Sequence, residues 1–588
     1  MNTRYLKALA GGMLALAITV PPATSAAKKK KVTKVTKATT TVAPATTATP
    51  ATTAAPATTP SAPVTTAVKA AATGGTGTKC NKVGGTFIDN WDLATSDAQH
   101  IDPGITSELV GAQIASSVWD GLTRVNPDTG ELLPDVAESW SANADSTVWT
   151  FKLKKGIKFS NGEDVLPSSF KKTWERNVSP ALGSEYADLA NVIKGWKEIQ
   201  DGKGKELAVV ADDANLTLTV NLSSPYGLLP QRVSHTLFYP LTKEGQAAGK
   251  DYEKGVMIGN GAFKMDGPRQ PDQQTKLVRS DSYFGGINGH PACLDALVFK
   301  VSKDPISAFA DFEAGNSMNS AIPVGKFADA TKKYGDRATK PRLTVQWVGF
   351  NWHDPILGGF GAAKLRQAIG AAIDRASINN IVFNGSRKIA TGFTPPGIPG
   401  YKAGLTQNFQ KEGADPALAK KLIAEYAKPI PKLTYWYRTS STEATIAQII
   451  QANLKDVGID IDIQGQSPTT YFSDVRNKNP QMFRAGWAWD YSGYDNGANQ
   501  QFHTTDDSSN NLEDFSVAQY DQLVDKAQAE GDAAKQASLY QQSESIVLDQ
   551  AAVIPLIHDR FSTVLSSKVD QYPQNALGFV EYSGVSLK

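Results

Sequence analysis

The sequence predicts an α/β protein with more than one domain, and three observations lead to this expectation. After a low-complexity N-terminal segment, residues 80–588 are too many for a single hydrophobic core. A strand–helix–strand pattern at residues 433–463 predicts parallel strands joined by a right-handed crossover. Alternation of apolar and polar residues at 148–159 and 207–222 predicts two antiparallel hairpins. The chain therefore combines a parallel α/β part with a mainly antiparallel part.

Residues 1–27 have the pattern of a secretory signal peptide. Arg4 and Lys7 flank the start of an apolar stretch at residues 6–20, and small residues follow at 24–27. The apolar stretch is shorter than the ~20 residues that span a bilayer, although an uncleaved anchor is the alternative. No cysteine follows closely, so a lipoprotein is not expected. We expect an exported, soluble protein in the periplasm, the cell wall or the extracellular space.

Residues 28–79 consist almost entirely of Lys, Thr, Ala, Pro and Val. Such a segment buries too little apolar surface to fold, so we expect a disordered linker. The first 79 residues contain ten basic side chains and no acid, while the whole chain has a net charge of +2. Residues 80–588 therefore carry about −8, which argues against nucleic-acid binding. The basic tail is expected to contact anionic cell-wall polymer or lipid head groups.

The chain has two cysteines, Cys80 and Cys293. Disulfides persist in exported proteins, so we favour a bridge between them over two free buried thiols. Such a bridge ties the first strand of the folded part to the region that begins at residue 294.

The first half of the folded part is rich in strands. In chain order the pattern predicts a strand at 85–91, a helix at 109–119, the two hairpins, and a helix near 168–176 between them. Trp149, Phe151 and Leu153 alternate with polar residues in the first hairpin, where Gly156 marks the turn.

The second half is rich in helices. Apolar spacing predicts one amphipathic helix at 364–382, and Asp415 followed by Pro416 predicts the start of another. In the strand–helix–strand unit, Ser440 and Glu443 form a capping-box pattern, and Gly458 ends the helix. A strand is expected at 482–487, followed by helices at 517–528 and 534–549, a strand at 552–558 and an irregular end.

Residues 483–496, FRAGWAWDYSGYDN, gather aromatic and charged side chains at a strand end. Asp490 lies among Trp487, Trp489, Tyr491 and Tyr494. Aromatic walls around a carboxylate suit a small charged organic ligand, and ligands of α/β sheets bind beyond the carboxyl ends of strands. The alternative is a strand of core aromatics that ends in an Asx turn.

Catalytic motifs are missing from the sequence. There is no GxSxG, HExxH or GxxxxGK[ST] pattern, and the six histidines are scattered without metal-ligand spacing. We therefore expect no enzyme activity, no metal and no cofactor.

Several segments resemble the extracellular solute-binding proteins that serve oligopeptide, dipeptide and nickel ABC importers (family 5). The resemblance covers residues 83–588, and it is carried by GELLPDVAESW at 130–140, IGNGAFKM at 258–265, KLRQAIGAAIDRASI at 364–378, GFTPPGIPGY at 392–401, RAGWAWDY at 484–491 and AAVIPLIH at 551–558. It implies a two-lobed periplasmic-binding-protein-like fold (type II), with an extra inserted subdomain and the ligand between the lobes. On that template, lobe 1 spans residues 80–344 with the insertion near 122–240, lobe 2 spans 345–555, and residues 556–588 return to lobe 1.

The same resemblance implies the function and the site. The protein would capture a short peptide and deliver it to the membrane permease subunits of an ABC transporter, as a monomer. Asp490 would bind the peptide α-ammonium, Arg484 would meet its carboxylate, and Trp487 would line the site. Tyr491 lies beside Asp490 in the same motif, and Glu108 is a candidate from lobe 1.

Two departures from the family pattern affect the site. Trp489 stands where the family has a small residue, which could reshape the pocket, and the expected strand SPTTYFSDV at 467–475 lacks the family's tryptophan. Because the fold also carries other solutes, one alternative is a receptor for a sugar or other small organic solute. Two further alternatives are a secreted hydrolase and a wall-associated scaffold.

Overall fold

The computed structural model describes residues 80–90, 97–285, 292–302, 304–323, 325–405, 411–467, 470–478, 480–504 and 510–588. The predicted signal peptide and linker lie outside these ranges. None of the helices within them has both the length and the apolar character needed to cross a membrane.

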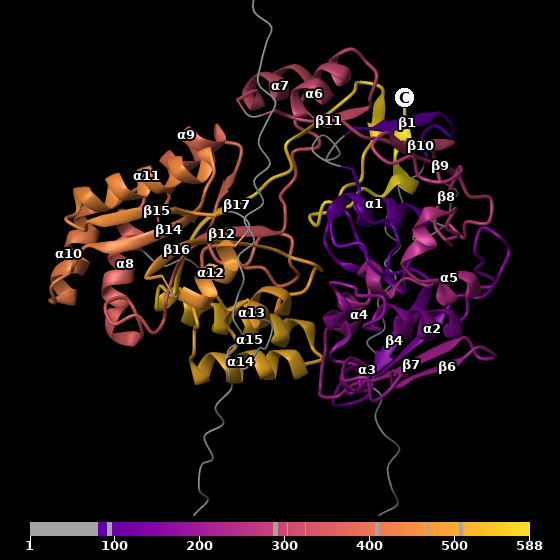
Figure 1. Cartoon of the computed structure of the whole chain (residues 1–588), viewed down its shortest axis with the longest axis horizontal. Coiled ribbons are helices and arrows are strands. Elements are labelled where there is room, and N and C mark those ends of the chain that lie inside the picture. The colour runs from indigo at the N-terminus through magenta and orange to yellow at the C-terminus, as the bar shows by residue number, and fades with distance from the viewer. Residues whose placement is uncertain are drawn as a thin grey trace, which may run out of the picture. The chain divides into compact units, whose positions relative to one another are not determined.

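A six-stranded mixed sheet forms the centre of the second half of the chain (Figure 1). The central strand β12 pairs antiparallel with β16 and β17, and β14 lies parallel to both β15 and β16. In spatial order the strands are β13 (Lys388–Ile389), β17 (Val553–His558), β12 (Thr344–Phe350), β16 (Met482–Ala488), β14 (Leu433–Arg438) and β15 (Ile461–Gln466).

Helices cover both faces of this sheet because its strands are apolar on both sides. In β12, Val345 and Trp347 face one helical layer, while Val348 and Phe350 face the other. The layer packed on Val348 contains α8 (Ala363–Ala372), α9 (Arg375–Phe383), α10 (Pro416–Tyr426) and α11 (Ser441–Asp456). The layer packed on Trp347 contains α12 (Tyr471–Lys478), α13 (Asp495–Phe502), α14 (Ala518–Ala529) and α15 (Ala533–Asp549).

A second core combines the two ends of the described chain. Residues from 87–119, 241–299 and 565–585 pack together in it. Its four-stranded sheet runs β1 (Thr86–Asp89), β10 (Ala296–Lys300), β9 (Gln274–Arg279), β8 (Phe263–Met265), and α1 (Leu109–Val118) packs near β8. The predicted disulfide between Cys80 and Cys293 is present, with the two Cα atoms 5.4 Å apart.

An antiparallel four-stranded sheet lies within the predicted insertion. Its order is β4 (Ala137–Ala142), β5 (Val148–Leu153), β7 (Thr217–Asn221), β6 (Val209–Asp212), with α2 (Pro167–Asn177) against it. The predicted hairpin at 207–222 is therefore confirmed. The hairpin at 148–159 is wrong, because β5 pairs with β4 and β7 and the chain after residue 153 forms turns.

The shorter elements complete the described chain. They are β2 (Thr123–Val125), β3 (Leu132–Pro134), α3 (Trp196–Gln200), α4 (Leu229–Arg232), α5 (Lys243–Ala247), α6 (Pro305–Glu313), β11 (Asn319–Ala321), α7 (Phe327–Tyr334), β18 (Thr563–Leu565), β19 (Val569–Gln571) and β20 (Ser586–Leu587). The expectation of an irregular C-terminus is thus wrong, because β18 pairs with β11 and β19 with β20.

Two short segments connect the six-stranded sheet to the β11–β18 pair. We call residues 339–344 and 558–563 the crossover segments. They pair with each other through a bridge between Pro341 and Arg560, and Arg342 N donates to Asp559 O at 2.9 Å.

Two other predictions are corrected. The single helix expected at 364–382 is two helices, because Ile373 is extended and Asp374 caps α9 by accepting a hydrogen bond from Ser377 N. The segment expected as a strand at 467–475 contributes the start of α12. The predicted domain boundaries remain a prediction; the one at residue 555 falls within β17.

Candidate functional site

Two neighbouring cavities lie near the carboxyl end of β16. The larger, about 290 Å³, has Arg484 and Trp487 in its wall. The smaller, about 190 Å³, has Asp490, Trp489 and Glu108 in its wall. Both include Arg342 and Ala488, so the cavities adjoin. The structure therefore gathers five of the six predicted ligand-binding residues around one crevice.

Asp490 lies just beyond the end of β16 and is partly buried. Its carboxylate accepts a hydrogen bond from Asn496 Nδ2 at 3.0 Å, and Tyr186 from the first half of the chain also hydrogen-bonds to it. Burial raises the pKa of Asp490 to about 6, although these two hydrogen bonds and the positive charge of Arg232 oppose the rise. Within the described chain, no arginine or lysine forms an ion pair with this carboxylate.

Asn496 holds the Asp490 loop in place. Its Oδ1 accepts hydrogen bonds from Asp490 N at 3.1 Å and from Trp487 Nε1 at 3.0 Å. Asn496 is fully buried in the first turn of α13, so one amide side chain positions both the carboxylate and an aromatic wall of the crevice.

The two remaining aromatic candidates pack into the core. Trp489 is 5% exposed, lies against Phe393, and occupies space left by Gly497, where an added Cβ would come within 2.3 Å of its ring. Trp489 therefore forms part of the wall without filling the pocket. Tyr491 is fully buried and donates to Asp495 at 2.7 Å, and it contributes to the wall of neither cavity.

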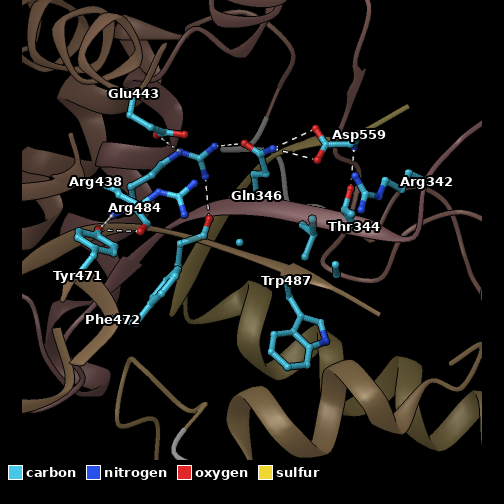
Figure 2. A pocket seen from close by; sticks show the side chains of 14 residues that line it. Arg342, Thr344, Gln346, Arg438, Glu443, Tyr471, Phe472, Arg484, Trp487 and Asp559 are labelled. Atoms are coloured by element: carbon cyan, nitrogen blue, oxygen red, sulfur yellow. Dashed lines mark hydrogen bonds and ion pairs between the residues drawn. The ribbon is translucent and has the colours of Figure 1, made fainter. Parts of the chain in front are cut away.

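Arg484 is 5% exposed and its guanidinium is occupied by protein groups (Figure 2). Its Nε lies 3.1 Å from Glu443 Oε2, Nη1 donates to Ala485 O at 2.7 Å, and Nη2 donates to Gln346 Oε1. The capping-box pattern of Ser440 and Glu443 is thus half realised: Ser440 caps α11, while Glu443 is paired with Arg484.

Two other arginines in this wall have no acidic partner among the residues that the structure describes. Arg438 is the last residue of β14, and Arg342 lies in a crossover segment. Among the described residues, neither guanidinium forms an ion pair. These two side chains, rather than Arg484, are available to an anionic group of a ligand in this structure.

Glu108 is the N-cap of α1. Its carboxylate accepts hydrogen bonds from Gly111 N at 2.7 Å and Gln99 N at 3.0 Å. Burial raises the pKa of Glu108, while these backbone donors oppose the rise. Because both contacts are structural, Glu108 shapes the wall of the smaller cavity and fixes the loop that leads to it.

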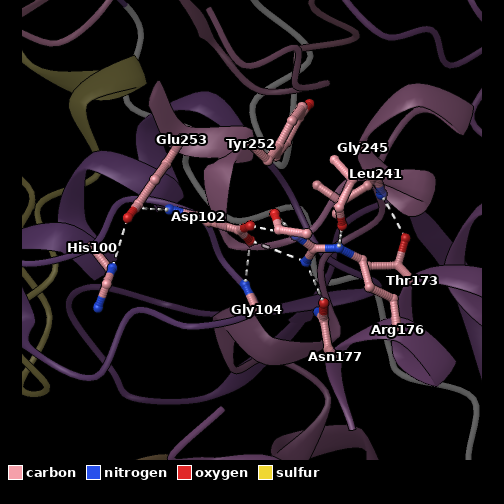
Figure 3. Close-up of polar contacts among 12 residues, drawn as sticks. His100, Asp102, Gly104, Thr173, Arg176, Asn177, Leu241, Gly245, Tyr252 and Glu253 are labelled. Atoms are coloured by element: carbon pink, nitrogen blue, oxygen red, sulfur yellow. Dashed lines mark hydrogen bonds and ion pairs between the residues drawn. The ribbon is translucent and has the colours of Figure 1, made fainter. Parts of the chain in front are cut away.

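A polar network holds the same loop from the other side (Figure 3). Glu253 accepts hydrogen bonds from Ile101 N at 2.7 Å and contacts His100 Nδ1 at 2.7 Å. Asp102 is paired with Arg176 of α2 at 2.6 Å. The loop before α1 is therefore anchored to the antiparallel subdomain as well as to its own helix.

Sequence reasoning missed several residues of the crevice, chiefly Tyr186, Asn496, Gln346, Arg342, Arg438 and Asp559. Arg438 had a usable signal, because it stands at the carboxyl end of a strand in a predicted strand–helix–strand unit. Tyr186 had none, since it lies in a loop more than 300 residues before Asp490.

Two sheet-bearing units joined by crossover segments, with a crevice at strand ends, are typical of receptors that close around a small solute. The model of the bacterial extracellular solute-binding proteins, family 5, matches residues 131–509. The chain belongs to this family, which confirms the resemblance drawn from the sequence.

Individual relatives cover most of the chain. The oligopeptide-binding protein OppA of Bacillus subtilis is 26% identical over 84% of this chain and 92% of its own length. The periplasmic murein peptide-binding protein MppA of Escherichia coli is 27% identical over 82% of this chain and 90% of its own. The unliganded open form of an MppA murein tripeptide-binding protein superposes with a TM-score of 0.75 at 24% identity, covering 86% of this chain and 98% of that one. The predicted two-lobed fold is thereby confirmed.

Proposed function

We propose that this protein is an extracytoplasmic receptor that captures a short peptide and delivers it to the permease of an ABC transporter. Membership of the solute-binding family supports the receptor role. The names of the relatives OppA and MppA support a peptide as the ligand. In this proposal the α-ammonium of the peptide binds Asp490.

One observation carries the assignment of the ammonium site. Asp490 is a carboxylate without a cationic partner in the described chain, and burial raises its pKa to about 6. A buried charge without a partner is unfavourable, and a ligand ammonium supplies both the charge and hydrogen-bond donors. Tyr186, which hydrogen-bonds to this carboxylate, lines the same cavity and limits its contact with water.

The opposite end of the crevice is positively charged. Arg484 is neutralised by Glu443, but Arg438 and Arg342 remain for a carboxylate of the peptide. A zwitterionic or acidic peptide thus fits the crevice, with its ammonium at Asp490 and its acidic group toward these arginines.

The ligand would be enclosed between two lobes. Lobe 1 consists of residues 80–344, with the insertion at 122–240, and of residues 556–588. Lobe 2 consists of residues 345–555. Tyr186 and His235 of the insertion line the smaller cavity together with Asp490. The buried pair of Arg232 and Asp495, 3.4 Å apart, connects the insertion to α13. Closure would exclude water and strengthen the contact between Asp490 and the ammonium.

A sugar-binding role finds less support. It would need exposed aromatic platforms, and of the two tryptophans only Trp487 is partly exposed at the cavity, since Trp489 packs into the core. We further propose that the chain is exported by its signal peptide, acts as a monomer without catalysis, and contacts the cell surface through the basic residues of 28–79.

Calorimetric titration with a tripeptide tests the ammonium site. Asp490→Asn keeps the shape but removes the charge, and affinity should fall by roughly a hundredfold, because an ammonium buried without its partner costs about 3 kcal/mol or more. The N-acetylated tripeptide should bind the wild type as weakly.

The matched control is Asp188→Asn, which removes a neighbouring negative charge that lies outside the cavity wall. It should change affinity by less than about threefold. Unchanged affinity in a fully folded Asp490→Asn protein would contradict the proposal. Mass spectrometry of the ligand that co-purifies with the wild type would identify the peptide.

A further inference from the structure

A third cavity, of about 180 Å³, lies against the crossover segments and is lined by three arginines and one acid. The arginines are Arg342, Arg387 and Arg560, and the acid is Asp559. We propose that this cavity is an oxyanion site that binds a carboxylate or phosphate group.

Arg387 and Arg560 each use part of their donor set in hydrogen bonds, and Arg342 makes a cation–π contact. Arg387 Nη1 donates to Arg560 O at 2.8 Å, and Arg560 Nη2 donates to Thr339 O at 2.6 Å. Arg342 lies over the ring of Phe561, 5.4 Å from its centroid. Since a guanidinium carries five donors in a planar fork, each arginine retains donors for a further acceptor.

One of these donors is buried without a partner. Arg560 Nε has no hydrogen-bond acceptor among the described residues although it is out of contact with solvent. Buried polar groups in folded proteins are nearly always hydrogen-bonded, and this unmet donor belongs to a residue that lines the cavity.

Asp559 does not neutralise the cluster. Its two oxygens accept from Gln346 Nε2 at 2.9 and 3.0 Å (Figure 2). One of them also lies 3.3 Å from Arg387 Nε. One carboxylate facing three guanidinium groups leaves two positive charges close together, which is unfavourable at low dielectric. An oxyanion removes this repulsion and accepts several charge-assisted hydrogen bonds at once.

The position of the cavity suggests what it does. Arg387 directly precedes β13 of the six-stranded sheet, whereas Ala321 and Ser562 belong to or adjoin the β11–β18 pair. Arg342 also lines both cavities of the ligand crevice. An anion here would contact elements on both sides of the crossover, and an acidic group of a ligand in the crevice lies next to it.

The first arm of the test uses inorganic phosphate and does not depend on the peptide proposal. Titration at constant ionic strength should show saturable binding to the wild type, and Arg342→Gln should weaken it at least tenfold, because a charge-assisted contact is lost. Arg387→Gln should do the same, which guards against a fold-specific effect of one variant. Melting temperature in chloride confirms that each variant is folded.

Lys388→Gln is the matched control. Lys388 is exposed, follows Arg387 directly as the first residue of β13, and lies outside the cavity wall, so this variant removes one positive charge close to the cavity. It should retain phosphate binding. Equal losses in Lys388→Gln and Arg342→Gln would show a general charge effect and overturn the proposal.

The second arm rests on the proposed peptide-binding function and compares the peptides Ala-Glu-Ala and Ala-Gln-Ala. A wild-type preference for the acidic peptide that Arg342→Gln and Arg387→Gln abolish assigns the oxyanion to the ligand. Phosphate binding without this preference assigns it to a free ion. Absence of both effects overturns the site. If the wild type binds phosphate but neither peptide, only the peptide proposal is contradicted.

Discussion

Two charged residues six positions apart, Arg484 and Asp490, were expected to bind opposite ends of one ligand, and the structure treats them differently. Arg484 is 5% exposed, paired with Glu443 at 3.1 Å and hydrogen-bonded to three further protein acceptors. Asp490 has only neutral hydrogen-bond partners, Asn496 and Tyr186.

The difference separates two uses of a charge in the walls of two adjoining cavities. Arg484 connects β16 to the start of α11 and to Gln346 of β12, so its charge stabilises the fold. Asp490 forms no ion pair within the described protein, so its charge is available to a ligand. The comparison predicts that removing the charge near Arg484 affects stability, and that removing the charge of Asp490 affects binding.

The largest expected effect follows from Glu443→Gln. This variant leaves the buried guanidinium of Arg484 without its counterion, and the free energy of unfolding should fall by about 3 kcal/mol. Urea denaturation measures the change. Asp456→Asn, which removes an exposed carboxylate from the same helix α11, should cost less than about 0.5 kcal/mol.

The same variant sharpens the comparison when a ligand is added. A released Arg484 should favour a tripeptide with a free carboxyl group over its C-terminal amide more strongly than the wild type does. If Glu443→Gln instead abolishes peptide binding at unchanged stability, the ion pair belongs to the binding site and the distinction drawn here is wrong.

A second prediction concerns Glu513, a fully buried carboxyl group that no ligand reaches through the two crevice cavities. It accepts a hydrogen bond from Trp347 Nε1 at 2.7 Å, and burial raises its pKa to about 8 from the usual 4.5. The bound proton therefore stabilises the fold fully below pH 4.5, and this contribution is lost as the pH rises through 8. Relative to the wild type, Glu513→Gln should gain about 4 kcal/mol of stability between pH 5 and 9.

Chemical denaturation across this pH range measures that gain. Asp514→Asn, at the neighbouring exposed position, should show no comparable slope. A flat difference between Glu513→Gln and the wild type would show that Glu513 is ionised in the folded protein. An ionised carboxylate without an ion-pair partner would then not distinguish Asp490 from Glu513.

The smallest effect is the pH dependence of peptide affinity. With a pKa of about 6, Asp490 is mostly ionised at pH 7 and mostly protonated at pH 5, while the peptide ammonium stays charged. Affinity of the wild type should fall by about tenfold over this interval. Asp490→Asn should show no such fall, and an identical slope in both proteins would assign the titration to another group.

The sequence was sufficient where local signals act within one element. The unit at 433–463 forms β14, α11 and β15 as predicted, because its capping residue and apolar spacing specify each element locally. The helix starting at Pro416 is confirmed for the same reason. The sequence also placed Asp490 beyond the end of a strand, since β16 ends at Ala488.

Local pattern misled where the outcome depends on a partner. Alternation at 148–153 correctly predicted a strand, but its neighbours β4 and β7 come from other segments, so no hairpin forms there. Apolar spacing continues through residues 364–382, yet Asp374 starts a second helix by capping it. Periodicity records which face is buried and does not identify what covers it.

The sequence by itself determined the family, the two-part α/β architecture, the cysteine pair and the segment that carries Asp490. Only the tertiary structure decided which charges of that segment are compensated, because Glu443, Gln346, Asn496 and Tyr186 come from four separate parts of the chain. It also decided that Trp489 turns into the core beside Gly497. Charge compensation and burial depend on neighbours in space, and these neighbours meet only when the chain is folded.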